Sequence, residues 1–300
     1  MARLKALTIA SAAVFALASS AFAADLLPPP PNLEPLPPSG SADFSGWYLR
    51  GDVGMAVNSS AIDLKTSPDP IASGGLVGAN EGYSNTTLSS SELADVGVGY
   101  QFNRWLRGDI TAEYRDGGHF QSLYSLNIPS TNTQYANFYR GDVSSFIGLA
   151  NVYADIGTWY GITPFVGGGI GLARNTLYGA TDTGQAYGPN LGGPSGGYFK
   201  DGSSTNFAWA LMTGIDFNVT SNLKLELGYR YLSYGKINSG ASNCLNGSGQ
   251  GNGFSAGSCG GSSYSIATSR LASNDFKLGL IWMLGDAGAP PPEAPLIRKY

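Results

Sequence analysis

Apolar and polar residues alternate along eight stretches of the chain. In the first stretch, one side chain in two is large and apolar, as in Trp47, Leu49 and Val53. A period of two is that of a β-strand, whose successive side chains point to opposite faces. The stretches that share this pattern are 47–57, 94–102, 106–115, 146–156, 162–172, 208–217, 223–231 and 275–284. The pattern predicts eight strands that each have one apolar face.

The length of these stretches is that of strands that cross a membrane. Each has about ten residues, which a tilted strand needs to span a bilayer. After the N-terminal segment, no run approaches the ~18 apolar residues of a spanning helix. Strands that enter a lipid bilayer must close into a barrel, and bacterial outer-membrane barrels have an even number of strands.

The predicted strands are joined alternately by short and long links. The short links are 103–104, 157–159 and 219–222. The long, polar links are 58–90, 116–142, 175–204 and 233–269. Long outer loops and short periplasmic turns are typical of outer-membrane barrels. The sequence therefore predicts an all-β fold, an eight-stranded antiparallel up-and-down transmembrane β-barrel, with the short turns and both termini in the periplasm.

A soluble eight-stranded barrel that carries a ligand inside is the alternative architecture. Its outer polar face would be rich in charge, whereas the polar faces here consist largely of Gly, Ala, Ser and Asn. The charges that occur mix signs on one strand, as in Arg50 and Asp52. Aromatic residues lie near the strand ends, as in the girdles of membrane barrels. These are Trp47, Phe102, Trp105, Trp209, Phe217, Tyr231 and Trp282. The pattern favours the membrane barrel.

The N-terminus has the features of an export signal. Arg3 and Lys5 precede an apolar core at 6–18, and 21–23 reads Ala-Phe-Ala. The core is too short for a membrane anchor, and the A-x-A site predicts cleavage before Ala24. The predicted organisation is a signal peptide (1–23), a Pro-rich periplasmic segment (24–44), the outer-membrane barrel (45–284) and a Pro-rich periplasmic tail (285–300).

The net charge of the chain does not favour binding to nucleic acid. Charged residues make up 13% of the chain, about half the share of a typical soluble domain. Loss of residues 1–23 removes two basic residues and no acidic ones, which leaves 15 basic and 21 acidic residues. A mildly acidic chain lacks the basic patch that nucleic acid requires.

The polar strand faces carry charges of both signs, and we expect them to form a network inside the barrel. They are Arg50, Asp52, Asp95, Arg107, Asp109, Glu113, Arg115, Lys224, Glu226, Arg230, Asp275 and Lys277. Paired carboxylates also serve acid–base catalysis. However, an eight-stranded barrel is just wide enough for side chains to fill, and buried charges must be paired. An interior ion-pair network is therefore the preferred interpretation, and it would block a wide pore.

Three smaller features of the sequence are candidate sites. Cys244 and Cys259 predict a disulfide, since export leads to an oxidising compartment and the single histidine, His119, is remote from them. His119 leaves a Ser–His–Asp enzyme open as an alternative. The glycines in 167–171 do not match a nucleotide-binding loop, which requires G-x-G-x-x-G before a helix. We expect no catalysis, cofactor or metal.

Several segments resemble a known group of proteins. They are Phe44–Gly54, Thr163–Gly171, 207–211, 225–231 and 276–280. They resemble small outer-membrane β-barrel proteins of the opacity-protein and OmpA-like transmembrane-domain type, in particular the alphaproteobacterial surface-antigen branch. The resemblance implies an eight-stranded barrel without a cofactor. One departure is the tail after Leu284, since many such barrels end on an aromatic residue of the last strand.

The sequence thus predicts a non-catalytic protein of the Gram-negative outer membrane that serves envelope structure and surface interaction. A narrow, porin-like channel for small solutes is the alternative, and a lipid-modifying membrane enzyme is a third possibility. The expected partners are outer-membrane lipids, with the cell-wall layer or a host surface reached through loops and tails.

Overall fold

The computed structural model describes residues 45–58, 62–67, 78–188, 191–245 and 263–284. Within these residues the fold consists of antiparallel strands and one short 3-10 turn, η1 (Pro129–Thr131). No helix there is long and apolar enough to cross a membrane. The prediction of an all-β, antiparallel fold is confirmed.

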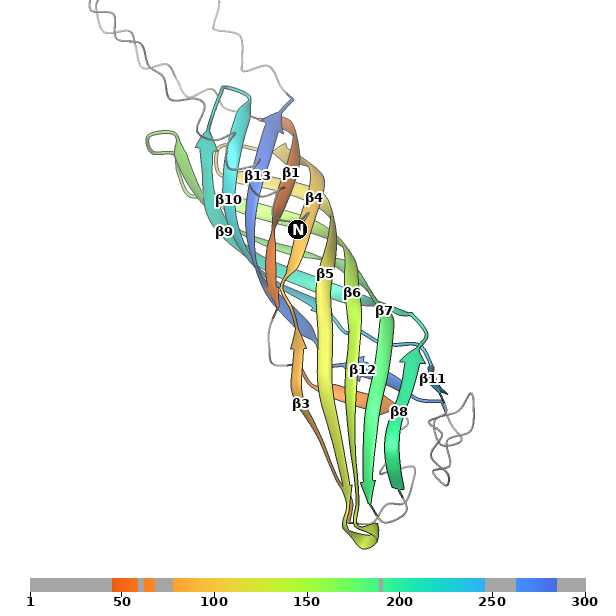
Figure 1. The fold of residues 1–300 in the computed structure, drawn as a ribbon. Helices are drawn as coiled ribbons and strands as arrows, with labels where there is room; N and C mark the ends of the chain where they lie inside the picture. The colour runs from red at the N-terminus through yellow and green to blue at the C-terminus, as the bar shows by residue number, and fades with distance from the viewer. Residues whose placement is uncertain (1–44, 59–61, 68–77, 189–190, 246–262, 285–300) are drawn as a thin grey trace, which may run out of the picture. The chain divides into compact units, whose positions relative to one another are not determined.

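Eight strands of the described sheet pair in a cyclic order. Their bounds are β1 (Gly46–Asn58), β4 (Ser91–Gln101), β5 (Leu106–Ile128), β6 (Thr133–Asp155), β7 (Ile162–Gly188), β9 (Gly202–Asn218), β10 (Leu223–Gly235) and β13 (Leu271–Met283). The order β7-β6-β5-β4-β1-β13-β10-β9 ends on a strand that pairs with β7 again. We call these eight strands the strand ring (Figure 1).

The pairing register shows how the strands tilt. One row of cross-strand partners passes through Leu172, Gly148, Ala112, Val96, Gly51, Leu280, Leu225, Phe217 and Ile162. The row leaves β7 at Leu172 and returns to it at Ile162, ten residues earlier. Such a stagger requires strands inclined by about 35–45° to the ring axis.

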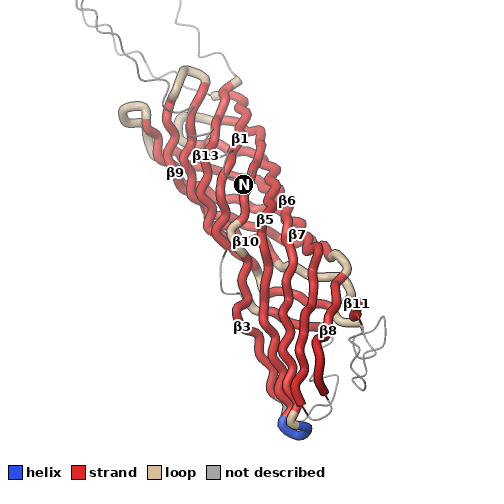
Figure 2. The backbone as a smooth tube through the Cα atoms, in the orientation of Figure 1, coloured by secondary structure: helices blue, strands red, loops and turns tan. Residues whose placement is uncertain are grey.

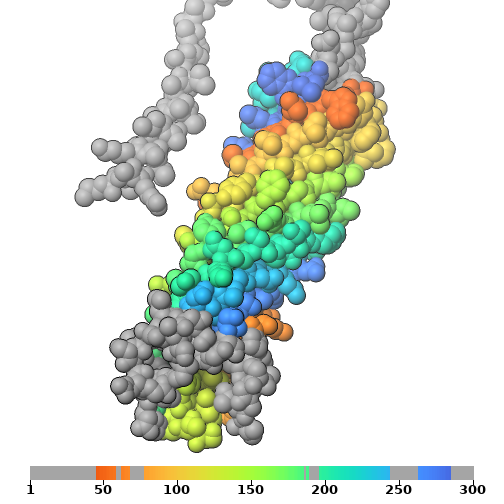
Figure 3. Space-filling view, turned by 90° about the vertical axis from the view of Figure 1, so that its right-hand side faces the viewer, coloured from red at the N-terminus to blue at the C-terminus, as the bar shows by residue number. Residues whose placement is uncertain are grey.

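The alternation of the sequence sorts side chains between the two faces of the ring. Val96 is 67% exposed on the outside, whereas its neighbour Asp95 is 4% exposed. Gly99 and Gly167 leave space on the inside, since a Cβ at either position would lie 2.5 Å or less from the ring of Tyr48 or Tyr153. The polar faces therefore point inward, and the wall is continuous on the side seen in Figure 3.

The prediction of long loops is wrong for two of the four segments. Most of 116–142 and 175–204 is strand, because β5, β6 and β7 continue beyond the ring (Figure 2). Gly117, with φ 79°, lies in a bulge between Arg115 and Gly118. A bulge inserts one residue and shifts the two-residue period. The alternation then resumes toward Ile128, and η1 forms the link to β6.

The strands beyond the ring form a sheet of their own, which we call the outer sheet. β5, β6 and β7 are flanked there by β3 (Asn80–Leu88), β8 (Leu191–Phe199) and β11 (Ser242–Leu245). The outer sheet buries a cluster of apolar side chains. A two-stranded ribbon of β2 (Leu64–Ser67) and β12 (Ser265–Thr268) contributes to this cluster. This cluster extends from Ile266 of the ribbon to inward residues of the ring such as Leu149.

Candidate functional site

The strand ring places all twelve predicted charges in one interior. Ten of them are buried, and Lys224 and Lys277 are partly buried. They come from β1, β4, β5, β10 and β13, so side chains that are distant in sequence meet across the lumen. Lys224 lies at the short-turn end, where its cross-strand partners are Asn218 and Ile281.

Arg107 organises the interior at the end of the short turns. Its guanidinium lies 3.2 Å from Asp155, 3.1 Å from Asp216 and 3.4 Å from Glu226. The guanidinium carbon also lies 4.8 Å from the ring centroids of both Tyr153 and Phe165. Arginine is suited to such a position, because its planar group binds carboxylates and stacks on aromatic rings together.

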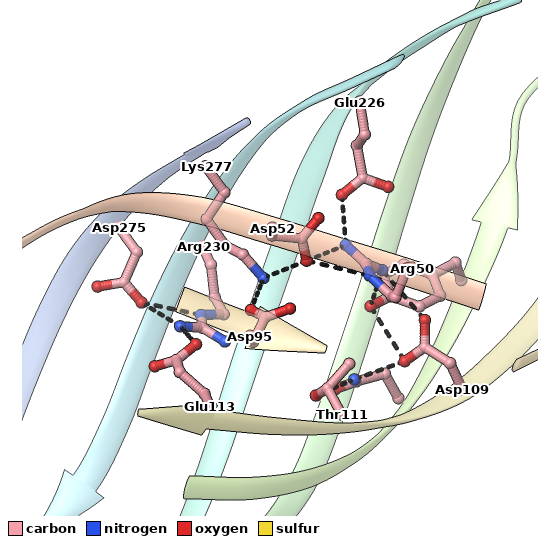
Figure 4. Close-up of polar contacts among 12 residues, drawn as sticks. Arg50, Asp52, Asp95, Asp109, Thr111, Glu113, Glu226, Arg230, Asp275 and Lys277 are labelled. Atoms are coloured by element: carbon pink, nitrogen blue, oxygen red, sulfur yellow. Dashed lines mark hydrogen bonds and ion pairs between the residues drawn. The ribbon is translucent and has the colours of Figure 1, made fainter. Parts of the chain in front are cut away.

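Arg50 and Lys277 bind the carboxylates of the next level. Arg50 lies 2.7 Å from Asp52, 3.0 Å from Asp109 and 2.7 Å from Glu226 (Figure 4). The Lys277 ammonium bridges Asp52 at 2.9 Å and Asp95 at 2.5 Å. Glu226 therefore links the Arg50 and Arg107 groups.

A four-membered cycle of two arginines and two carboxylates closes the outer level. Arg115 and Arg230 each pair with both Glu113 and Asp275, at 2.5–2.8 Å. Ser273 accepts a further hydrogen bond from Arg115 and donates one to Asp275. Each of the four ions in the cycle thus has two charged partners, which offsets part of the cost of removing it from water.

Two further carboxylates belong to this network and were not predicted from the sequence. Asp155 and Asp216 lie on the inward faces of β6 and β9 and are the first partners of Arg107. Their position in the alternation was the available signal, since both occur one residue after an outward side chain. With them, the described interior contains eight carboxylates and six cationic side chains.

The part of the interior around Arg50 leaves little room for water. A cavity lined by Arg50, Tyr153 and Glu226, among others, has a volume of about 10 Å³. One water molecule needs about 10–15 Å³. Beyond the four-membered cycle, Ile147, Leu149 and Leu232 are buried in the apolar cluster. An ion-pair network therefore fills one part of the lumen, and an apolar core fills the next.

His119 does not form a catalytic triad with the groups described around it. Its exposed ring places Nδ1 2.6 Å from Oδ1 of Asp142. Ser89 is near, but its Oγ accepts a hydrogen bond from the backbone N–H of His119, not from the ring. The glycines at 167–171 lie within β7, so the nucleotide-loop alternative does not fit either.

A second polar cluster lies in the outer sheet and was not predicted. Asp182 of β7 is buried, and accepts hydrogen bonds from Asn137 at 3.0 Å and from the Tyr264 hydroxyl. Tyr264 immediately precedes the β2–β12 ribbon, so this contact joins the ribbon to the sheet. Burial raises the pKa of Asp182, and its two hydrogen-bond donors oppose that shift.

The buried Asp182 predicts a pH dependence of the outer sheet. The pKa of Asp182 is raised above its ordinary value of 3.8 in the folded state. At a pH between these two pKa values, the folded protein therefore binds a proton that the unfolded protein does not bind. Stability should therefore fall as pH rises through this window and stay lower above it. Hydrogen exchange of β6 and β7 backbone amides, compared near pH 4 and pH 7 after correction for intrinsic rates, should show this slope. Asp182→Asn should flatten it, and an unchanged slope would contradict the assignment.

Some predictions lie outside the described residues. Cys244 is in β11, but Cys259 falls in 246–262, so the disulfide stays a prediction. The signal peptide (1–23), the segment 24–44 and the tail 285–300 also lie outside the described residues.

Comparison with known proteins gives consistent matches. Residues 9–258 match the family model described as the outer membrane protein beta-barrel domain. A protein of Brucella abortus, whose function is uncharacterised, is 34% identical over 235 residues, which are 74% of this chain and 78% of the relative. A Rickettsia prowazekii protein, provisionally named an adhesin, is 25% identical over 193 residues, covering 63% of this chain and 72% of its own. An opacity protein of Neisseria gonorrhoeae is 23% identical over 225 residues, which are 66% of this chain and 92% of the opacity protein.

Proposed function

The chain belongs to the outer membrane protein β-barrel family, and we propose that it is a sealed barrel that presents the outer sheet for contact with other surfaces. The family resides in the outer membrane of Gram-negative bacteria, and the resemblance to opacity-type proteins is confirmed. The observation that carries the proposal is the lumen filled with paired ions and apolar side chains.

In this proposal, the strand ring is the closed, eight-stranded membrane barrel within 45–284. Large apolar side chains cover its outer wall, including Val53, Ile110, Ile170 and Leu280. Trp47 and Trp282 lie at the short-turn end and are exposed, as in an interfacial girdle. The first residues of β1 and the last of β13 lie at this same end, which would face the periplasm.

The outward face of the outer sheet is suited to contact. Phe138, Tyr187 and Tyr198 are exposed there among polar side chains. Phe138 is the cross-strand partner of Thr183. Aromatic residues are enriched at protein interfaces, since they add contact area at low entropic cost. A rigid sheet also costs less entropy on binding than a flexible loop.

The proposal is tested with the full-length protein in two assays. Planar-bilayer recordings of refolded protein should show small or rare currents. Cells that display the wild type should adhere to host cells or matrix, and Phe138→Ser with Tyr198→Ser should reduce adhesion by about tenfold or more, the loss expected for interface anchors.

The matched control is Thr181→Ser with Thr183→Ser on the same face, which keeps both hydroxyl groups and should leave adhesion unchanged. Equal adhesion of both variants and the wild type would overturn the contact surface. Large, stable currents in the wild type would instead favour the narrow-channel alternative.

A further inference from the structure

The outer rim of the strand ring divides into sectors of opposite charge. Where the exposed apolar wall ends on β4, β5 and β6, the next outward charged residues are Glu92, Asp116 and Asp142. On β7, β10 and β13 they are basic, and just before β9 the next outward charged residue is Asp201, four residues beyond the Arg174 partner Thr205. Arg174 follows Leu172 on β7, Lys236 follows β10, and Arg270 precedes β13.

These three cations, which we call the basic sector, have no acidic partner in the part of the chain that the structure describes. All three are exposed, and among the described residues no ion pair within 4.0 Å involves them. Gly235 and Leu271 are cross-strand partners, so Lys236 and Arg270 follow on adjacent strands at the same level. Like charges on neighbouring strands repel each other, which an anion between them would relieve.

The backbone holds the basic sector in place. The Lys236 carbonyl accepts hydrogen bonds from Asn175 at 3.0 Å, Ser204 at 2.8 Å and Asn206 at 3.1 Å. These donors belong to β7 and β9, so Lys236 is tied to the strand that carries Arg174. Three side-chain donors on one carbonyl fix the chain at this point, whereas the Lys236 residue itself is exposed.

An apolar surface of β7, β9 and β10 lies directly below the basic sector. Phe207 and Leu172 are cross-strand partners on β9 and β7, and both are exposed. Trp209 and Tyr231 pack together with ring centroids 5.5 Å apart. Cations above an aromatic and aliphatic wall match an amphiphile that has acyl chains below and an anionic headgroup above.

We propose that the basic sector binds the phosphorylated headgroup of a lipid in the outer leaflet, while its acyl chains lie against β7, β9 and β10. The proposal rests on the membrane orientation given above. Three cations suit a headgroup with more than one phosphate, since each phosphate offers several acceptor oxygens. The acidic sector on β4, β5 and the neighbouring strand β6 would repel the same headgroup, so the lipid would occupy one side of the barrel.

The test uses full-length protein in phosphatidylcholine nanodiscs that contain a small fraction of lipid A or of dephosphorylated lipid A. After detergent extraction, native mass spectrometry counts the lipid that stays bound. Wild-type protein should retain lipid A at least about tenfold better than the dephosphorylated form, given the attraction of each cation to an anionic surface. The triple variant Arg174→Gln, Lys236→Gln, Arg270→Gln should lose this preference.

A charge-matched control is Lys65→Gln, Arg104→Gln, Arg140→Gln, which removes three exposed cations elsewhere and should keep the preference. Resistance to unfolding on an unheated gel checks that each variant is folded. Equal retention of the two lipids by the wild type, or equal retention of lipid A by wild type and triple variant, would overturn the proposal. Lipid retention is independent of current, so wild-type channel activity would end the sealed-barrel proposal and leave this result unaffected.

Discussion

Replacing Arg107 and Arg230 together with alanine should destabilise the barrel and open a path for ions. Arg107 holds Asp155, Asp216 and Glu226, and Arg230 holds Glu113 and Asp275. Removal of one partner from a buried ion pair typically costs about 3–5 kcal/mol, because the other charge stays buried without compensation. The two arginines share no carboxylate, so the two losses should be roughly additive.

Conductance should rise in this variant for the same physical reason. Two long side chains are removed from a lumen whose described cavity holds about one water. Uncompensated carboxylates would draw water and cations into the vacated space. Single-channel recording and urea unfolding in lipid vesicles measure the two effects on the same protein.

A neutralising change gives the sharpest control. Asp216→Asn, added to Arg107→Ala, removes a carboxylate that the first change leaves without its arginine. The combined variant should regain part of the lost stability, since the penalty comes from the orphaned charge. If Arg107→Ala with Arg230→Ala unfolds at the same urea concentration as the wild type, the ion pairs do not stabilise the ring.

The interior shows which parts of the site could be read from the alternation. Each charge was assigned to a face by its position relative to large apolar neighbours, and this places Arg50, Glu113 and Lys277 in one lumen. Which cation meets which carboxylate could not be predicted, because it depends on the ten-residue stagger of the ring. The stagger is a property of the pairing between strands and leaves no mark within one strand.

The apolar part of the lumen could not be predicted from the sequence, for a different reason. In β6, Phe146 faces outward and Ile147 and Leu149 face inward. Both faces of this part of the strand are therefore apolar, and the two-residue period disappears from the sequence. The outer sheet was missed in a similar way, since the bulge at Gly117 shifts the period of β5 and polar side chains cover its exposed face.

An arginine in place of Val96 should destabilise the folded barrel by about 2–4 kcal/mol, the cost of this side chain near the bilayer midplane. Val96 is the middle residue of β4 and is highly exposed on the outer wall. Leu225→Arg should cost less, about 0–1 kcal/mol, because Leu225 lies two residues from the short-turn end of β10. Urea unfolding in lipid vesicles measures both values.

Thr183→Arg in the outer sheet provides the control outside the membrane. Thr183 is exposed, so a charged side chain there stays in water and should change the free energy of unfolding by less than about 0.5 kcal/mol. The order Val96, Leu225, Thr183 follows from depth in the bilayer alone, since all three side chains belong to paired strands. A soluble barrel would leave Val96 in water as well, and equal, small effects at all three positions would contradict the membrane orientation.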